Sequence, residues 1–149
     1  EVYLKGDPRY GNKLASKIIN KIMLQGKKTT AQTLFYDAID TVVAKVEGAE
    51  PVDVFTKAIE NIKPRVEVRS KRVGGATYQV PREVNKRRQQ SLAIRWLVDA
   101  ARAKRGKPMA KSLAEEFFDA FNNQGAAVTK KENVHKMAEA NSAYSHFAW

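Results

Sequence analysis

The dipeptide Gly74-Gly75 constrains this chain more than any other feature, because it joins two short runs in which β-branched and aromatic residues alternate with polar ones. Two successive glycines accept the positive φ values that a two-residue hairpin turn demands. The pattern therefore predicts a β-hairpin over about residues 65–82. A two-stranded hairpin is marginal in isolation, so this one must be held against a larger body.

Helical periodicity predicts that body. Three apolar stripes with helical spacing precede the hairpin: one starts at Asn12, the next follows a capping-box pattern of Thr29 and Gln32, and the third has Pro51 in its first turn. Gly26 is expected to end the first of these helices.

Three more helices are expected after the hairpin. Pro81 should open a short connection to a fourth helix, a fifth should follow Pro108, and a second capping box, formed by Thr129 and Glu132, should begin a sixth. A chain of 149 residues is most simply one domain. The predicted fold is mainly α: a single domain over residues 1–149, with about six helices and a basic hairpin inserted between the third and fourth.

Positive charge is concentrated around the hairpin. Residues 63–105 carry thirteen Lys and Arg against three acids, so this segment supplies +10 of the net charge of +11. Such a block attracts phosphates at long range and favours a polyanionic partner. Cations in the first turns of the fourth helix oppose the helix dipole, which also points to an external anion. A membrane surface is disfavoured, because these residues fall on a hairpin and on a helix with a buried face.

Enzyme chemistry finds little support. Without cysteine the chain has neither a disulfide nor a thiolate site. His135 and His146 are eleven residues apart and have no neighbouring carboxylate pair at the spacing of metal ligands, so neither a metal site nor a general base is indicated. Residues 6–13 resemble a phosphate-binding loop but lack its Gly-Lys-Ser/Thr ending. The pair Glu115-Glu116 is interpreted as a solvated helix face. We therefore predict no catalytic residue, metal or cofactor, and, since no apolar run could span a bilayer, a soluble cytoplasmic protein.

Aromatic residues leave alternatives open. Tyr78 on the hairpin either stacks on a base or packs on its cross-strand neighbour, whereas Trp96 is expected in the core. Tyr144, Phe147 and Trp149 either pack or touch RNA. The bases of the hairpin have no matching acids in the sequence, and this absence favours nucleic-acid contact over a merely solvated charge cluster.

Four stretches of the chain carry a family resemblance: VEVRSKRVGGATYQVP at residues 66–81, GKKT at 26–29, LAIRW at 92–96 and HKMAEAN at 135–141. They are similar to the signature of the small-subunit ribosomal protein seven family in its bacterial form. The resemblance implies a primary binder of the 3′ major domain of 16S rRNA that nucleates assembly of the subunit head. It also implies a hairpin directed toward exit-site tRNA and mRNA, and a contact with the eleventh protein of the subunit.

Site residues follow from the resemblance and the basic block together. The expected rRNA-binding residues are Lys27, Lys28, Arg69, Lys71, Arg72, Arg82, Lys86, Arg87, Arg88, Arg95, Arg102, Lys130, Lys131 and Lys136. The residues expected near tRNA and mRNA are Arg72, Val73, Gly74, Gly75 and Tyr78. No obligate homo-oligomer is expected.

The predicted mechanism is binding, in which phosphate contacts supply affinity and the folded shape of an RNA junction supplies specificity. The main alternative is a DNA-architectural protein with the hairpin as a minor-groove arm, which would bind duplex DNA comparably and form a homodimer. An enzyme would require a deep pocket with convergent titratable groups.

Overall fold

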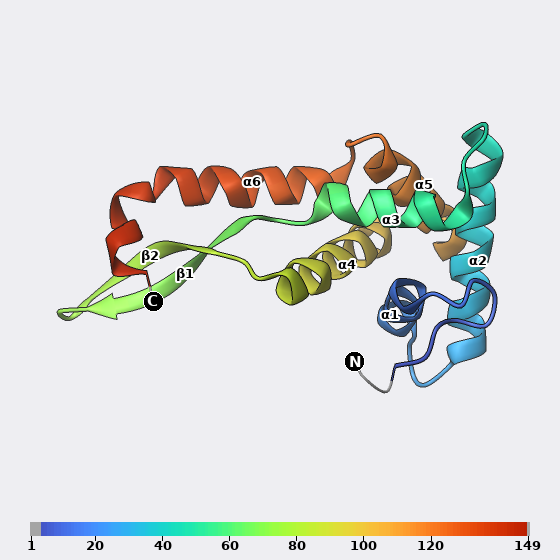
Figure 1. Ribbon diagram of the computed structural model, residues 1–149, viewed down its shortest axis with the longest axis horizontal. Coiled ribbons are helices and arrows are strands. Elements are labelled where there is room, and N and C mark those ends of the chain that lie inside the picture. Colours follow the sequence, from blue (N-terminus) through green and yellow to red (C-terminus); the bar gives the residue numbers. More distant parts are fainter. Residues whose placement is uncertain (1–3, 149) are drawn as a thin grey trace.

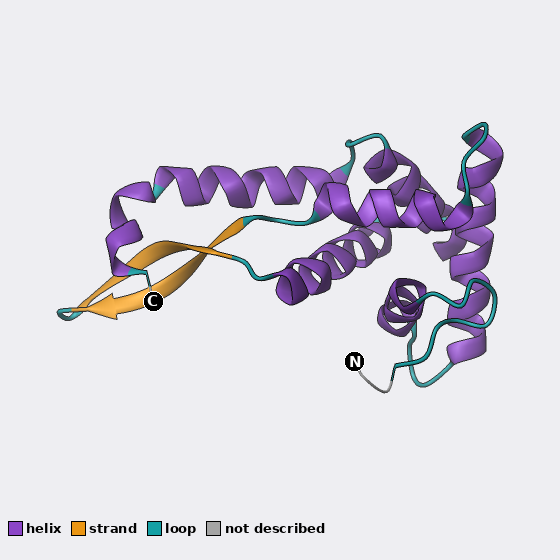
Figure 2. Ribbon diagram, in the orientation of Figure 1, coloured by secondary structure: helices purple, strands orange, loops and turns teal. Residues whose placement is uncertain are grey.

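The computed structural model describes residues 4–148 and has an elongated shape, with a helical body at one end and a hairpin extending from it (Figures 1 and 2). In chain order the elements are α1 (Lys13–Ile22), α2 (Lys28–Lys45), α3 (Pro51–Ile62), β1 (Val66–Val73), β2 (Ala76–Glu83), α4 (Lys86–Ala103), α5 (Met109–Phe121), α6 (Ala126–Ala140) and the 3-10 helix η1 (Ser142–Phe147). Within these residues the fold is mainly helical, and its hairpin lies between the third and fourth helices, which confirms the predicted fold class.

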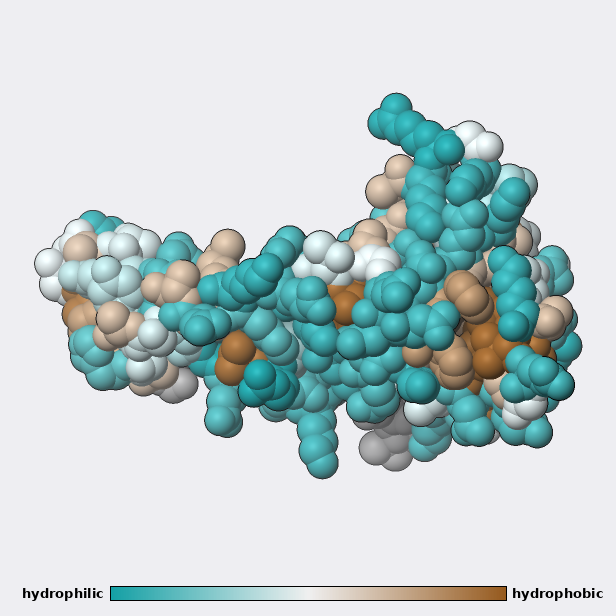
Figure 3. Space-filling view, turned by 90° about the horizontal axis from the view of Figure 1, so that it is seen from above, coloured by the Kyte–Doolittle hydropathy of each residue, from teal (hydrophilic) through white to brown (hydrophobic). Residues whose placement is uncertain are grey.

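The core lies where α2, α3 and α5 meet. Phe35 contributes from α2, Phe55 from α3 and Phe117 from α5, and all three rings are fully buried. The ring centroid of Phe35 lies 5.4 Å from that of Phe55 and 5.9 Å from that of Phe117, both in edge-to-face arrangements. Apolar residues three and four positions apart build this core because they share one face of each helix. Seen from above, most of the surface is hydrophilic, and apolar atoms gather mainly at the α2 end (Figure 3).

The hairpin has the predicted two-residue turn. Its strands pair antiparallel from Val66 opposite Glu83 to Val73 opposite Ala76. Gly74 and Gly75 both have positive φ, 58° and 85°, the combination that a type I′ turn requires.

The hairpin runs beside α6 and meets η1 near its free end (Figure 1). At its base, the Arg65 backbone N–H donates a 2.9 Å hydrogen bond to His135 Nε2 on α6. Further out, Lys71 Nζ donates a 2.6 Å hydrogen bond to the Phe147 carbonyl oxygen. The hairpin therefore packs against the C-terminal elements α6 and η1.

Tyr78 lies opposite Lys71 in the hairpin, and its ring packs on η1. Its ring centroid lies 5.1 Å from that of Tyr144 and 5.0 Å from that of Phe147. These contacts show a packing role for Tyr144 and Phe147, while Trp149 lies outside the described residues. Trp96 is only partly buried, although it does pack against the core.

Both predicted capping boxes are wrong. Helix α2 begins at Lys28, one residue before Thr29, and its N-cap Lys27 makes no side-chain capping bond. Helix α6 begins at Ala126, three residues before Thr129, after a Gly125 with φ of 96°. Tertiary packing sets this earlier start, because burial of the first turn of α6 orders the helix before the polar pattern begins.

Two other expected boundaries differ. Helix α1 ends at Ile22, four residues before Gly26. Strand β2 continues through Pro81 to Glu83, so the connection to α4 is shorter than predicted. A proline is compatible with β2 because each strand of a two-stranded sheet has an unpaired edge.

The prediction of a solvated Glu115-Glu116 face is wrong. Glu116 is only 2% exposed, and its Oε2 lies 3.0 Å from Lys104 Nζ. The same ammonium lies 3.1 Å from Glu115 Oε2, and Lys107 Nζ lies 2.8 Å from Glu115 Oε1. The end of α4 folds against α5, so Lys104, the C-cap residue of α4, neutralises a carboxylate that the sequence pattern predicts to be exposed.

Candidate nucleic-acid interface

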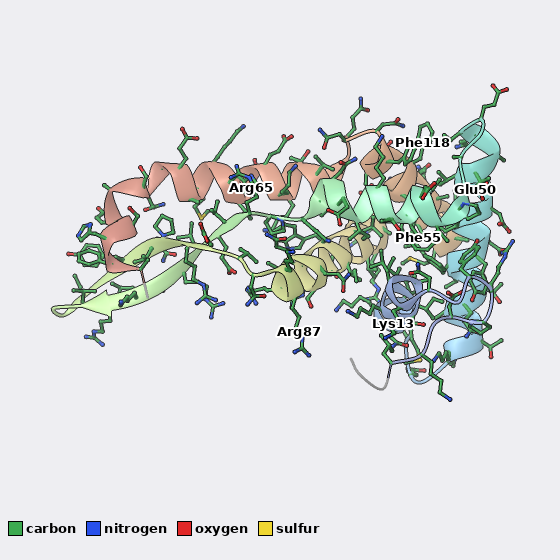
Figure 4. The ribbon with its side chains drawn as sticks, in the orientation of Figure 1. Lys13, Glu50, Phe55, Arg65, Arg87 and Phe118 are labelled. Carbon is green, nitrogen blue, oxygen red and sulfur yellow. The ribbon has the colours of Figure 1, made fainter. Side chains whose placement is uncertain are left out.

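The predicted basic residues come from four places: the junction of the α1–α2 loop with α2, the hairpin, α4 and α6. Ten of the fourteen are exposed, namely Lys27, Lys28, Arg69, Arg72, Lys86, Arg87, Arg95, Arg102, Lys130 and Lys136, while Lys71, Arg82, Arg88 and Lys131 are half-buried. In Figure 4 the Arg87 side chain points away from α4 into solvent.

Helix α4 opens with three successive cations. Asn85 is its N-cap, and the Asn85 side chain accepts a 2.9 Å hydrogen bond from the backbone N–H of Arg88. Lys86, Arg87 and Arg88 then form the first turn, which contains no acid. Because the unpaired N–H groups of a helix start already carry partial positive charge, this turn presents a site for an anion.

A groove of about 420 Å³ lies between α1 and α4 and is lined by Lys17, Lys21, Arg87 and Arg95, with Ile94 among its other lining residues. Lys17 Nζ also donates a 2.6 Å hydrogen bond to Gln90 Oε1, which ties the two helices together. Four cations along one groove form a track for a phosphate backbone.

Sequence reasoning missed Lys17 and Lys21. They lie four residues apart and therefore share one face of α1. That spacing was the available signal, but without the fold nothing in the sequence connects this face to α4.

Several predicted contacts also have partners inside the protein. Arg88 forms a bidentate pair with the buried Glu67, with Nε 2.5 Å from Oε2 and NH2 3.0 Å from Oε1. Arg69 NH1 lies 3.7 Å from Glu67 Oε1, so the view that the hairpin bases lack matching acids is wrong. Arg102 donates 3.1 and 3.2 Å hydrogen bonds to the carbonyl oxygens of Lys21 and Ile22, which are among the last carbonyls of α1.

Three carboxyl groups have lowered pKa values. Burial alone would raise the pKa of Glu67, but the hydrogen bond and positive charge of Arg88 lower it. Burial likewise opposes ionisation of Asp7, but hydrogen bonds from the Asn12 and Tyr10 backbones and the Tyr36 hydroxyl outweigh it. Hydrogen bonds from Lys107 and Lys104 lower the pKa of Glu115 to about 2.

These three groups predict loss of stability in acid. A carboxyl group with a lower pKa in the folded state binds protons more readily once unfolded, so its contribution is complete above the ordinary pKa. That contribution is lost as pH falls from the ordinary values, 3.8 for Asp7 and 4.5 for Glu67 and Glu115, toward the folded values. Urea unfolding should therefore give a free energy that declines below about pH 5. In the control variant Asp7→Asn the decline should be smaller, and stability that holds or rises toward pH 3 would contradict this account.

The described residues include no cluster of metal ligands, and His135 has a structural contact. Among residues 4–148, no three His, Cys, Asp or Glu side chains come close enough together to hold a metal ion. His135 accepts the Arg65 hydrogen bond, and burial together with the positive charges of Arg65 and Lys131 lowers its pKa. The described helices include none that is both long and apolar enough to cross a membrane.

A helical body with a basic groove, a cationic helix start and a basic hairpin defines a structural protein that binds a polyanion. Comparison with known proteins identifies the family to which the chain belongs. The chain matches the family described as ribosomal protein S7p/S5e over residues 2–142. The chain therefore belongs to the ribosomal protein S7p/S5e family.

Individual relatives agree with the family match. The chain is 61% identical to the small ribosomal subunit protein uS7 of Rhodopirellula baltica, over 98% of this chain and 94% of that protein. Its identity to the proteins of the same name from Fervidobacterium nodosum and Thermotoga neapolitana is 57% and 56%, each over 96% of this chain and 92% of the relative.

Family membership decides between the functional classes. The chain is a structural constituent of the small ribosomal subunit, binds rRNA, takes part in translation in the cytoplasmic ribosome and is not an enzyme. The sequence resemblance is thereby confirmed.

Proposed function

We propose that this chain is a primary binder of the 3′ major domain of 16S rRNA and nucleates assembly of the subunit head. The observation that carries the proposal is the groove in which Lys17 and Lys21 of α1 face Arg87 and Arg95 of α4. Because helix packing holds these cations in place, they can fix the register of a folded RNA without reading its sequence.

Four of the predicted basic residues extend the positive charge beyond this groove. Lys27 and Lys28 carry positive charge from α1 toward α2, and Arg69 and Arg72 carry it along the hairpin. We take residues 1–149 as a single rRNA-binding domain on this basis.

The free end of the hairpin is proposed to lie near exit-site tRNA and mRNA. Arg72, Gly74 and Gly75 are exposed there, and Val73 is half-buried. Tyr78 faces Tyr144 and Phe147, so the turn residues reach a neighbouring RNA before the Tyr78 ring does. The surface that η1 and the hairpin share is the proposed contact with the eleventh protein of the subunit.

A salt series tests the proposal. Binding of the full chain to a 3′ major domain fragment of 16S rRNA should persist at salt concentrations that abolish binding to duplex DNA of equal length. In the double variant Arg87→Ala and Arg95→Ala, the slope of log affinity against log salt should fall in magnitude by about two units, about one for each phosphate contact.

Lys45→Gln is the matched control, because Lys45 is an exposed cation in the last turn of α2, away from the groove. Its slope should equal that of the unsubstituted chain. Equal affinities for RNA and DNA that collapse together with salt would overturn the proposal and leave only a nonspecific polyanion site.

A further inference from the structure

A second hollow, unlike the basic groove, lies where the chain passes from α1 to α2. It measures about 310 Å³, roughly ten times the volume share of one water molecule. Its apolar lining comes from Ile22, Leu24, Ala31 and Leu34. Leu24 is 64% exposed, the highest fraction among the large apolar side chains that the structure describes as exposed.

The loop presents Leu24 on a closed turn. Gln25 has φ of 55° and Gly26 has φ of 73°, so two successive residues occupy the left-handed region. For a residue other than glycine this conformation costs about 1 kcal/mol or more and must be held by its surroundings. The Lys27 N–H donates to the Leu24 carbonyl at 3.1 Å, and the Lys28 N–H donates to the Gly26 carbonyl at 2.9 Å. A strained and internally bonded turn therefore keeps an apolar side chain in solvent.

Charge around the hollow favours a nucleic acid. Lys27 lines it, Lys28 follows directly in the chain, and the Arg102 guanidinium bonds to the carbonyl of Ile22, a lining residue. No acidic side chain is among its lining residues. The larger hollow between α2 and α3 differs, because Glu47, Glu50 and Asp53 line it and would repel phosphate.

Two polar side chains that line the hollow can hydrogen-bond to the edge of a heteroaromatic ring such as a nucleobase. The Gln25 amide offers both a donor and an acceptor, and the Thr30 hydroxyl does the same. Both residues are exposed, so their polar atoms are within reach of a bound molecule. Apolar walls with a few polar groups are the usual environment of a nucleobase taken out of its stack.

We propose that this hollow receives one unstacked nucleobase of the rRNA. The base lies against Leu24 and Leu34, Gln25 and Thr30 bond to its edge, and Lys27 and Lys28 hold the adjoining phosphates. The inference rests on the proposed rRNA-binding function and adds a contact that is not ionic. That difference separates it experimentally from the basic groove.

The test measures binding of Leu24→Ala to the same 16S rRNA fragment across the salt series. Affinity should fall by roughly tenfold at every salt concentration, the equivalent of about one buried leucine contact, with an unchanged salt slope. Met137→Ala is the matched control, because Met137 is another exposed large apolar residue, 56% exposed, but lies on α6. Its affinity should equal that of the unsubstituted chain, and circular dichroism should show that both variants are folded.

A crosslink gives a direct readout. Since the chain has no cysteine, Leu24→Cys provides a unique attachment point for a photoreactive group. Crosslinking to one unpaired nucleotide supports the proposal. Leu24→Ala binding as tightly as Met137→Ala, or crosslinks scattered over many nucleotides, would overturn it while leaving the proposed function intact. Failure of the unsubstituted chain to prefer the rRNA would count against the proposed function instead.

Discussion

Replacing Arg88 with alanine should lower the free energy of unfolding by about 2–3 kcal/mol, because it removes the closest described ion-pair partner of the buried Glu67 carboxylate and leaves Arg69 at 3.7 Å. Removing one partner of a fully buried pair costs about 3–5 kcal/mol. The expected loss is smaller here because the Arg88 side chain remains 35% exposed. Urea unfolding at neutral pH, followed by circular dichroism, measures the change.

The double variant Glu67→Leu and Arg88→Met is the control for this prediction. Apolar side chains of similar volume often replace a buried ion pair at little cost, so the double variant should recover most of the lost stability. It also isolates any RNA contact of Arg88. If Arg88 touches a phosphate, the stable double variant should have a salt slope smaller by about one unit. Full stability of Arg88→Ala alone would show that the pair contributes nothing to the fold.

Replacing Phe35 with alanine should lower the free energy of unfolding by about 3–5 kcal/mol. Phe35 is fully buried and packs against Phe55, Phe117 and Tyr36, so truncation opens a cavity among three helices and removes edge-to-face ring contacts. Thermal and urea unfolding both measure this loss.

Phe35→Leu is the conservative control and should cost less, because it fills most of the cavity that alanine leaves. Neither substitution touches the basic groove, so rRNA affinity of the folded fraction should be unchanged. A cost below 1 kcal/mol for Phe35→Ala would mean that the three helices close around the missing ring, contrary to the tight packing of protein interiors.

Local patterns were sufficient for much of the fold. Gly74-Gly75 specified the hairpin turn because glycine accepts the positive φ that both turn positions have without support from tertiary contacts. Pro51 likewise marked the start of α3, since its fixed φ suits a first helical turn. Helix starts that depend on packing, such as that of α6 at Ala126, were not predictable from capping residues.

The site was only partly predictable for the same reason. The cations of α4 stood out as a cluster in the sequence, but their neighbours Lys17 and Lys21 lie some seventy residues earlier and are brought close only by helix packing. The pairing of Glu67 with Arg88 and the burial of Glu116 beside Lys104 are also tertiary events. Charge counting along the chain cannot distinguish a base that faces solvent from one that neutralises an internal acid.

The two attachments of the hairpin have a consequence for the thermodynamics of docking. Its base is hydrogen-bonded to α6 through His135. Its outer part is attached to η1 by the hydrogen bond of Lys71 and by the packing of the Tyr78 ring. A hairpin held at two levels has few orientations to lose when a partner arrives. Ordering a loose arm on binding would cost conformational entropy and would weaken the affinity. A preorganised arm avoids most of this cost, so its contacts with the partner contribute more fully to the binding free energy.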